Sequence, residues 1–123
     1  KKKLNDKIFL LGFKKNVFKY LSKAKLFILT SLWEDPGWVL IEAAACNTLI
    51  LASDCKNGPK EFLENNKGGL LFENNSIESL LINYKKIVNL SFNEIIEKKV
   101  YSKKKIKNYS LFNHHLNLVN ILE

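Results

Sequence analysis

Two glutamates stand at a spacing that suits the binding of a ligand at the start of a helix. Glu34 precedes an apolar helical pattern, and Glu42 lies inside that pattern, with seven residues between the two. Glu42 therefore falls one to two turns into the helix, and both carboxylates can face one cleft from different depths. Carboxylates accept hydrogen bonds from hydroxyl groups and leave the donors that a phosphate needs free. The pair indicates a site for a ligand that carries both hydroxyl and phosphate groups.

A structural interpretation of the same pair stays open. An acid just before a helix stabilises the helix dipole, and Glu42 would then be an ordinary surface residue. The sequence around Glu42 favours the binding interpretation, because this acid is set in the apolar run Val39–Ala45. A carboxylate in such a run needs a hydrogen-bonding partner.

The segment that carries Glu34 is polar and rich in turn formers. It covers residues 30–38 and leads from an apolar run into the helix. Gly37 allows backbone N–H groups to come close to a ligand, and the amino end of the helix favours an anion such as phosphate. Two further polar segments, Gly12–Asn16 and Ser53–Pro59, also follow apolar runs. In an open parallel sheet all three would lie at the carboxyl edge, where ligands bind.

The elements that must position these segments alternate along the chain. Apolar runs at 8–11, 26–29 and 49–52, and a shorter one at 70–72, predict strands that are buried on both faces. Helical patterns at 17–24, 39–45 and 59–63 lie between them. Strands about 20 residues apart with helices between them predict βαβ units in a three-layer α/β domain with a parallel sheet.

After residue 72 the sequence predicts helices only. The first should start at Asn75 and Glu78, Ser91 and Glu94 form a capping box for the second, and Ser110 can cap the last. The apolar stripes expected to be buried are Ile77, Leu80, Leu81, Tyr84, Ile87 and Val88 on the first, Phe92, Ile95, Ile96 and Val100 on the second, and Leu111, His115, Leu118 and Leu122 on the third.

The composition excludes some functions and weakens others. With 46% hydrophobic and 26% charged residues, the chain can build a core. The net charge of +8 comes from 20 lysines without any arginine, which weakens specific nucleic-acid recognition but suits an anionic membrane surface. Cys46 and Cys55 are expected to be reduced thiols, and neither they nor the adjacent His114 and His115 form a metal-binding pattern.

Several motifs in the same order resemble the family 4 retaining glycosyltransferases. These enzymes have the GT-B fold, in which the active site lies between two Rossmann-like domains. The motif of two glutamates with seven residues between them carries most of the resemblance, in Glu34–Ala45. The supporting segments are Phe9–Gly12, Tyr20–Leu21, Ala24–Ser31, Ser53–Cys55, Gly58–Pro59, Glu61, Gly69–Phe72 and Tyr109–Ser110. Asn47 stands where the family usually has glycine.

The resemblance implies a role for each motif residue. Glu34 would contact the hydroxyls of the transferred sugar and is the expected catalytic residue, although not as a nucleophile. Glu42 would bind the ribose of the nucleotide, and the base would lie near the loop after Gly12. The residues expected to bind the donor are Glu34, Asp35, Pro36, Gly37, Trp38, Val39, Glu42, Gly12 and Phe13. No metal ion or other cofactor is expected, since helix dipoles and basic side chains stabilise the leaving group in this fold.

The resemblance also implies that residues 1–123 are the donor-binding domain of a longer enzyme. The chain does not begin with Met, and the basic residues that grip the diphosphate in this family would precede Lys1. The expectation is therefore half of a GT-B fold, truncated at its N-terminus, whose missing partner is the acceptor-binding domain. Such a piece is expected to be inactive by itself.

The expected activity is the transfer of a hexosyl or N-acetylhexosaminyl group from a nucleoside-diphosphate sugar to a lipid-linked or surface glycan. The resemblance places such an enzyme in the cytoplasm, at the inner membrane face. Two alternatives stay open: a domain similar to nucleotide-sugar 2-epimerases, and a non-catalytic, lysine-rich module that binds a membrane or nucleic acid.

Overall fold

Three short strands form a parallel sheet in the computed structural model, which describes residues 7–122. They are β1 (Leu26–Leu29), β2 (Leu49–Ser53) and β3 (Leu70–Phe72), in the order β1-β2-β3. Leu26 is opposite Leu49, and Leu51 is opposite Leu70. These strands confirm the predicted positions 26–29, 49–52 and 70–72. The predicted burial on both faces is wrong for β1, where Ile28 is 39% exposed, because β1 lies at the edge of the sheet.

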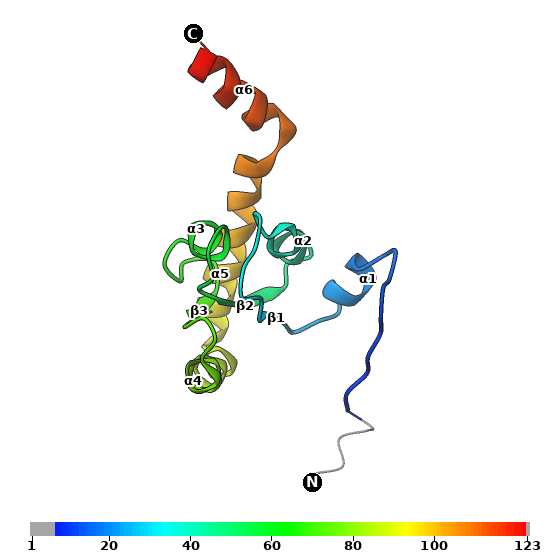
Figure 1. Ribbon diagram of the computed structural model, residues 1–123. Helices are drawn as coiled ribbons and strands as arrows, with labels where there is room; N and C mark the ends of the chain where they lie inside the picture. Colours follow the sequence, from blue (N-terminus) through cyan, green and yellow to red (C-terminus); the bar gives the residue numbers. More distant parts are fainter. Residues whose placement is uncertain (1–6, 123) are drawn as a thin grey trace.

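The predicted strand at 8–11 is wrong. Residues 8–11 are extended but pair with no strand among residues 7–122, and Phe9 and Leu10 are strongly exposed. A β-strand depends on ladder hydrogen bonds to a neighbour, so an apolar run alone does not form one. Figure 1 shows this segment running along the outside of α1, away from the sheet.

Most of the helices lie where the sequence patterns predict them (Figure 1). Pro59 opens α3, Asn47 takes a left-handed conformation after α2, and the predicted capping box of Ser91 and Glu94 opens α5. Two helices differ in their bounds. The helix predicted over 17–24 ends at Leu21, because the N–H groups of Lys23 and Ala24 bond to carbonyls three residues back and form turns. Ser76, not Asn75, caps α4, because the Ser79 N–H donates to its hydroxyl. The bounds are α1 Phe18–Leu21, α2 Trp38–Ala45, α3 Pro59–Leu63, α4 Ile77–Val88, α5 Phe92–Lys105, the 3₁₀ helix η1 Ile106–Tyr109, and α6 Leu111–Leu122.

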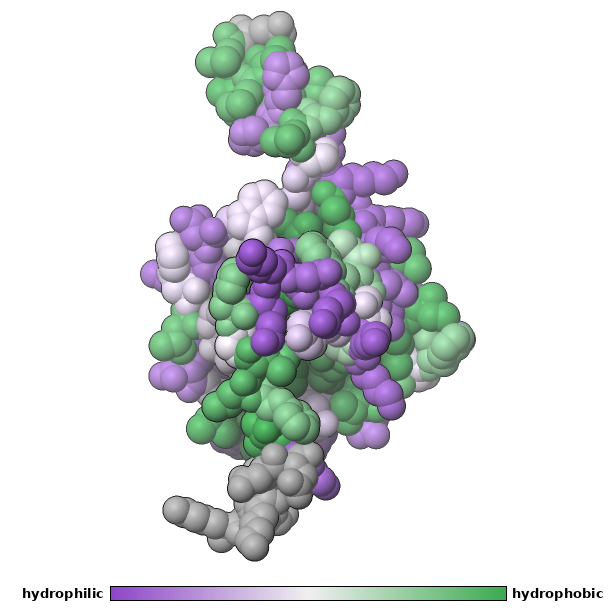
Figure 2. Space-filling view, turned by 90° about the vertical axis from the view of Figure 1, so that its right-hand side faces the viewer, coloured by the Kyte–Doolittle hydropathy of each residue, from purple (hydrophilic) through white to green (hydrophobic). Residues whose placement is uncertain are grey.

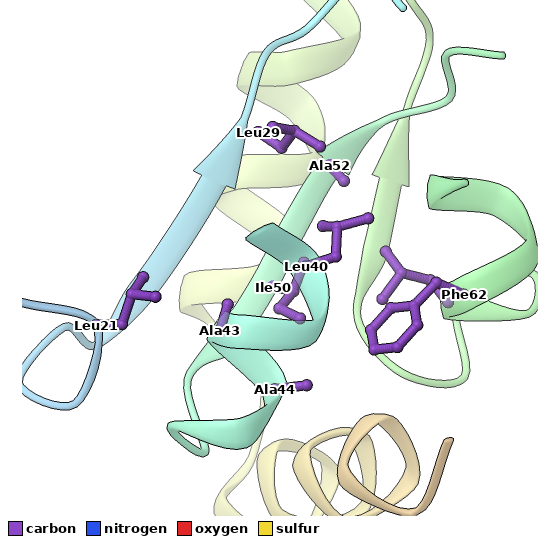
Figure 3. Packing of buried hydrophobic residues seen from close by; sticks show 9 residues of the cluster. Leu21, Leu29, Leu40, Ala43, Ala44, Ile50, Ala52 and Phe62 are labelled. Carbon is purple, nitrogen blue, oxygen red and sulfur yellow. The ribbon is translucent and has the colours of Figure 1, made fainter. Parts of the chain in front are cut away.

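The central strand β2 is buried on both faces and makes the domain three layers thick, as predicted. Ile50 and Ala52 face α2, where Leu40 and Ala43 pack on them, and Phe62 of α3 completes this cluster (Figure 3). On the other face, the cluster of Leu49, Leu51, Leu70 and Phe72 packs against Ile87 of α4. The alternation along β2 follows from the two-residue period of a strand.

The amino edge of the sheet is covered by α5. Gly68, just before β3, lies against Ser102 of α5, and a Cβ atom on Gly68 would be 3.3 Å from the Ser102 Cβ. Ile95 of α5 packs with the cluster that contains Leu49 and Leu70, the first residues of β2 and β3. Because this helix occupies the amino ends, the loops at the carboxyl ends form the opposite edge.

The predicted apolar stripes of the last helices are only partly buried. Ile87 is the one stripe residue of α4 that is fully buried, Leu80 and Ile95 are half-buried, and most of the others are exposed. A three-stranded sheet is narrow, so each helix contacts it along one line rather than over a whole stripe. Ser110 caps α6 as predicted, through the Asn113 N–H. Figure 2 shows α6 standing apart from the rest of the molecule.

Candidate functional site at the carboxyl edge

The loop after β1, residues 30–37, is bound to the loop after β2. The backbone N–H of Glu34 donates to the Lys56 carbonyl at 3.3 Å, and Trp33 pairs with Lys56 in an isolated parallel bridge. This bridge continues the pairing of β1 and β2 beyond the strands themselves. The backbone of Glu34 is therefore fixed at the carboxyl edge, as the sequence predicted for its segment.

Two side chains from neighbouring strand ends hold successive carbonyls of the same loop. The Ser53 hydroxyl donates to the Ser31 carbonyl at 2.6 Å, and the Asn74 amide donates to the Leu32 carbonyl at 3.0 Å. Ser53 ends β2 and is buried, and Asn74 follows β3. Sequence reasoning missed both contacts, because nothing in a serine or asparagine shows which distant carbonyl it will meet.

The amino end of α2 is uncapped by any side chain. Gly37 is its N-cap, with a left-handed φ of 83° that an L side chain rarely adopts. The first backbone bond from the helix is that of the Leu40 N–H to the Gly37 carbonyl, at 2.9 Å. The N–H groups of a first helical turn have no acceptor within the helix. Those of Trp38, which is exposed, and of Val39, which is half-buried, can therefore serve an anion, whereas Gly37 itself is buried.

The Glu34 carboxylate lies beside this helix start. A Cβ atom on Gly37 would be 3.6 Å from Glu34 Oε2, which is ordinary van der Waals contact, so the carboxylate lies directly beside the N-cap of α2. Glu34 is half-buried. The geometry places a hydrogen-bond acceptor next to a set of free donors, as a ligand with both hydroxyl and phosphate groups requires.

The other residues of the motif occupy the first two turns of α2 and the turn before it. Asp35 and Trp38 are exposed, and Trp38 keeps 57% of its surface accessible. Val39 is half-buried against the core, so only its backbone is available to a ligand. Glu42 is half-buried beside the fully buried Ala43. The structure thus brings the predicted residues from Glu34 to Glu42 together on one loop and one helix.

Gly12 and Phe13 do not join them in this structure. Both lie in the extended segment before α1, where Phe13 is 89% exposed. A Cβ atom on Gly12 would meet nothing within 4 Å. Their assignment to the donor site therefore stays a prediction of the sequence alone.

A cavity of about 710 Å³ adjoins the site beyond the loop after β2. It shares Lys56 with the contacts described above, but Glu34 and Glu42 do not line it. An ion pair of Lys60 with Asp54, 3.7 Å apart, lies on its wall. The residues that line the cavity are Asp54, Cys55, Lys56, Asn57, Gly58, Lys60, Glu61, Glu64, Asn65 and Lys105.

Glu64 joins α3 to α5 on the far wall of this cavity. Its carboxylate accepts hydrogen bonds from Lys105 Nζ and from the Tyr101 hydroxyl. The bond from Lys105, followed by that from Tyr101, lowers the pKa of Glu64 to about 2. The charges on this wall are therefore paired with one another, which makes the cluster a structural clamp.

Within residues 7–122, no three His, Cys, Asp or Glu side chains come together as a group that could hold a metal ion. Over the same residues, no helix combines the length and the apolar character needed to cross a membrane.

Comparisons with known proteins agree with this arrangement. Residues 1–111 match the family described as glycosyl transferases group 1. The chain is 34% identical over 125 residues to the poly(ribitol-phosphate) alpha-N-acetylglucosaminyltransferase of Staphylococcus aureus. This match covers 97% of the chain and 25% of that enzyme. The chain is also 39% identical over 70 residues to a Campylobacter jejuni enzyme, an N-acetylgalactosaminyltransferase named for a diphospho-undecaprenol substrate. This match covers 57% of the chain and 19% of that enzyme.

Solved structures show the same architecture. The crystal structure of TarM superposes with a TM-score of 0.77 at 31% identity, over 94% of this chain and 23% of TarM. A variant of Staphylococcus aureus TarM in complex with fondaparinux, alpha-GlcNAc-glycerol and UDP gives a TM-score of 0.81 at 30% identity, over 95% of this chain and 24% of the variant. These neighbours are GT-B glycosyltransferases, and the chain spans about a quarter of their length or less. The chain belongs to the family of glycosyl transferases group 1.

Proposed function

We propose that this chain is the donor-binding part of a retaining glycosyltransferase, which moves a sugar from a nucleoside-diphosphate sugar to a glycan acceptor. The observation that carries the proposal is the juxtaposition of the Glu34 carboxylate with the uncapped amino end of α2. A nucleotide sugar needs hydrogen-bond acceptors for its hydroxyls and donors for its diphosphate. The Glu34 carboxylate is such an acceptor, and the first N–H groups of α2 are such donors. The presence of UDP in the complex of a 30% identical relative supports the same class of donor.

In this proposal each motif residue has a separate task. Glu34 accepts hydrogen bonds from hydroxyls of the transferred sugar, and Glu42 accepts those of the ribose. The N–H groups of Trp38 and Val39 receive the sugar or the diphosphate. The positive end of α2 then stabilises the charge that develops on the departing nucleoside diphosphate, without a metal ion.

The acceptor side of the proposal is supported by the names of the relatives. One is named for a diphospho-undecaprenol substrate and another for poly(ribitol-phosphate), so both act on lipid-linked or polymeric anionic glycans. We propose an acceptor of the same broad class, and a site of action at the cytoplasmic face of the membrane. The lysine excess would favour contact with anionic lipid there.

A titration of the isotope-labelled protein tests the donor site. Uridine and guanosine diphosphate sugars are added to millimolar concentration, and backbone amide resonances are followed by NMR. The proposal expects the largest changes at Gly37, Trp38 and Val39. Parallel titrations with an RNA oligonucleotide and with anionic lipid vesicles test the lysine-rich module. The proposal is overturned if RNA or vesicles shift the spectrum and no nucleotide sugar does.

A further inference from the structure

Asn74 contacts the loop after β1 although it follows β3, and β3 does not pair with β1. The sheet order is β1-β2-β3, with β2 between the other two strands. Its amide Nδ2 nevertheless donates to the Leu32 carbonyl at 3.0 Å, 42 residues earlier in the sequence. The loop after β1 therefore extends across the carboxyl end of β2, and Asn74 holds it in that position.

The contact is one of three that fix a short stretch of backbone. The Ser31 carbonyl accepts from the Ser53 hydroxyl, the Leu32 carbonyl accepts from Asn74, and the Glu34 N–H donates to the Lys56 carbonyl. Ser53 and Lys56 belong to β2 and its loop, so Asn74 supplies the one anchor of the three that comes from β3. Without it, the loop is held from one side only.

Asn74 itself projects from an anchored base. The N–H of the preceding residue, Glu73, donates to the Ser79 hydroxyl at 2.9 Å. The Ser79 N–H in turn donates to the hydroxyl of Ser76, the N-cap of α4. Asn74 Oδ1 is buried and has no partner among the described residues, so the hydrogen bonding of this amide rests on Nδ2.

We propose that Asn74 is a positioning residue of the donor site, which acts through the Leu32 carbonyl on the loop that carries Glu34. The proposal rests on the donor-binding role of that loop. Asn74 touches no reacting group in this account. Its effect is to fix where the Glu34 backbone and the amino end of α2 stand relative to one another.

Two substitutions separate this role from a purely structural one. Asn74→Asp keeps the shape of the side chain but replaces the donating amide by a carboxylate, which repels the Leu32 carbonyl. Asn74→Ala removes the side-chain shape and the hydrogen-bond donor together. Asn89→Asp and Asn89→Ala are the matched controls, because the Asn89 amide donates to the Lys85 carbonyl at 2.8 Å, at the far end of α4. The four variants are compared in the full-length enzyme for donor KM, kcat and thermal midpoint, and in residues 1–123 for the amide shifts of residues 31–37.

The positioning role predicts that both Asn74 variants raise the donor KM roughly two- to tenfold. The Asn89 variants should lower the thermal midpoint by about as much as the Asn74 variants do, but should leave the donor KM unchanged. The amide shifts of residues 31–37 should move only in the Asn74 variants. Unchanged shifts, or a donor KM equal to that of the matched control, overturn the proposal.

The same measurements distinguish a failure of the proposed function. If the unsubstituted full-length enzyme shows no dependence on any nucleotide sugar, the donor role is wrong, and the positioning proposal falls with it. If the unsubstituted full-length enzyme uses the donor normally and the Asn74 variants do as well, only the role of Asn74 is wrong.

Discussion

Gly58 lies against the backbone of Pro36, so closely that a Cβ atom on Gly58 would be 2.1 Å from the Pro36 carbonyl oxygen. The contact joins the loop after β2 to the turn that precedes α2. It is the closest backbone approach recorded for any glycine of the described residues. The two loops consequently form one surface, and a change in either one displaces the start of α2.

Replacing Gly58 by alanine should damage both stability and donor binding. The new methyl group would overlap Pro36, and the φ of 136° is one that L residues rarely adopt. Strain of this kind costs about 1–3 kcal/mol of unfolding free energy. Chemical denaturation measures that loss, and a nucleotide-sugar titration measures the loss of affinity. In Gly68→Ala the methyl group would meet the Ser102 side chain at 3.3 Å at the opposite edge, so this variant should keep its donor affinity.

The clamp at Glu64 predicts a specific pH dependence of stability. The pKa of Glu64 is lowered from 4.5 to about 2 by hydrogen bonds from Lys105 and Tyr101. A carboxylate whose folded pKa is depressed stabilises the fold above its unfolded pKa. This contribution should be complete above pH 4.5 and should fall away as the pH drops toward 2.

Denaturation curves of Glu64→Gln and the unsubstituted protein between pH 2 and 7 test this dependence. The variant should be less stable near neutral pH, and the difference should shrink in acid. Glu78→Gln, at the first turn of α4, removes one carboxylate without touching the clamp. A difference for Glu64→Gln that stays constant over this pH range would exclude the clamp.

Ile87 should contribute far more to stability than its neighbours on α4. It is 1% exposed and closes the second core cluster, whereas Ile82 is 59% exposed. Truncating a buried isoleucine to alanine costs about 2–5 kcal/mol. Thermal or urea denaturation of Ile87→Ala should show a loss in that range, and Ile82→Ala should lose much less. Equal losses would show that α4 packs through a different face.

The three strands and α2 were predictable because the sequence signals for them are local. The runs at 26–29, 49–52 and 70–72 are continuously apolar. A short run of this kind is typical of a strand in a parallel sheet that has helices on both faces. Pro59 and the capping box at Ser91 mark helix starts through backbone chemistry that acts within a few residues. The resemblance of residues 34–45 then gave the candidate site.

The errors came from features that depend on distant partners. Residues 8–11 have the composition of a strand, but pairing decides whether a strand forms, and composition does not show the partner. The stripe on α4 was expected to be buried as a whole, whereas the narrow sheet buries only Ile87 completely. The role of Asn74 was not predicted at all, because its bond to the Leu32 carbonyl connects residues 42 positions apart.

The central claim is that the segment from Glu34 to Glu42 binds the donor, and Glu42→Gln in the full-length enzyme tests it most directly. Loss of a hydrogen bond from a charged acceptor should raise the donor KM roughly 10- to 100-fold, with an unchanged thermal midpoint. Glu97→Gln, on α5, is the control for the loss of one carboxylate. A donor KM for Glu42→Gln equal to that of the unsubstituted enzyme would contradict the account.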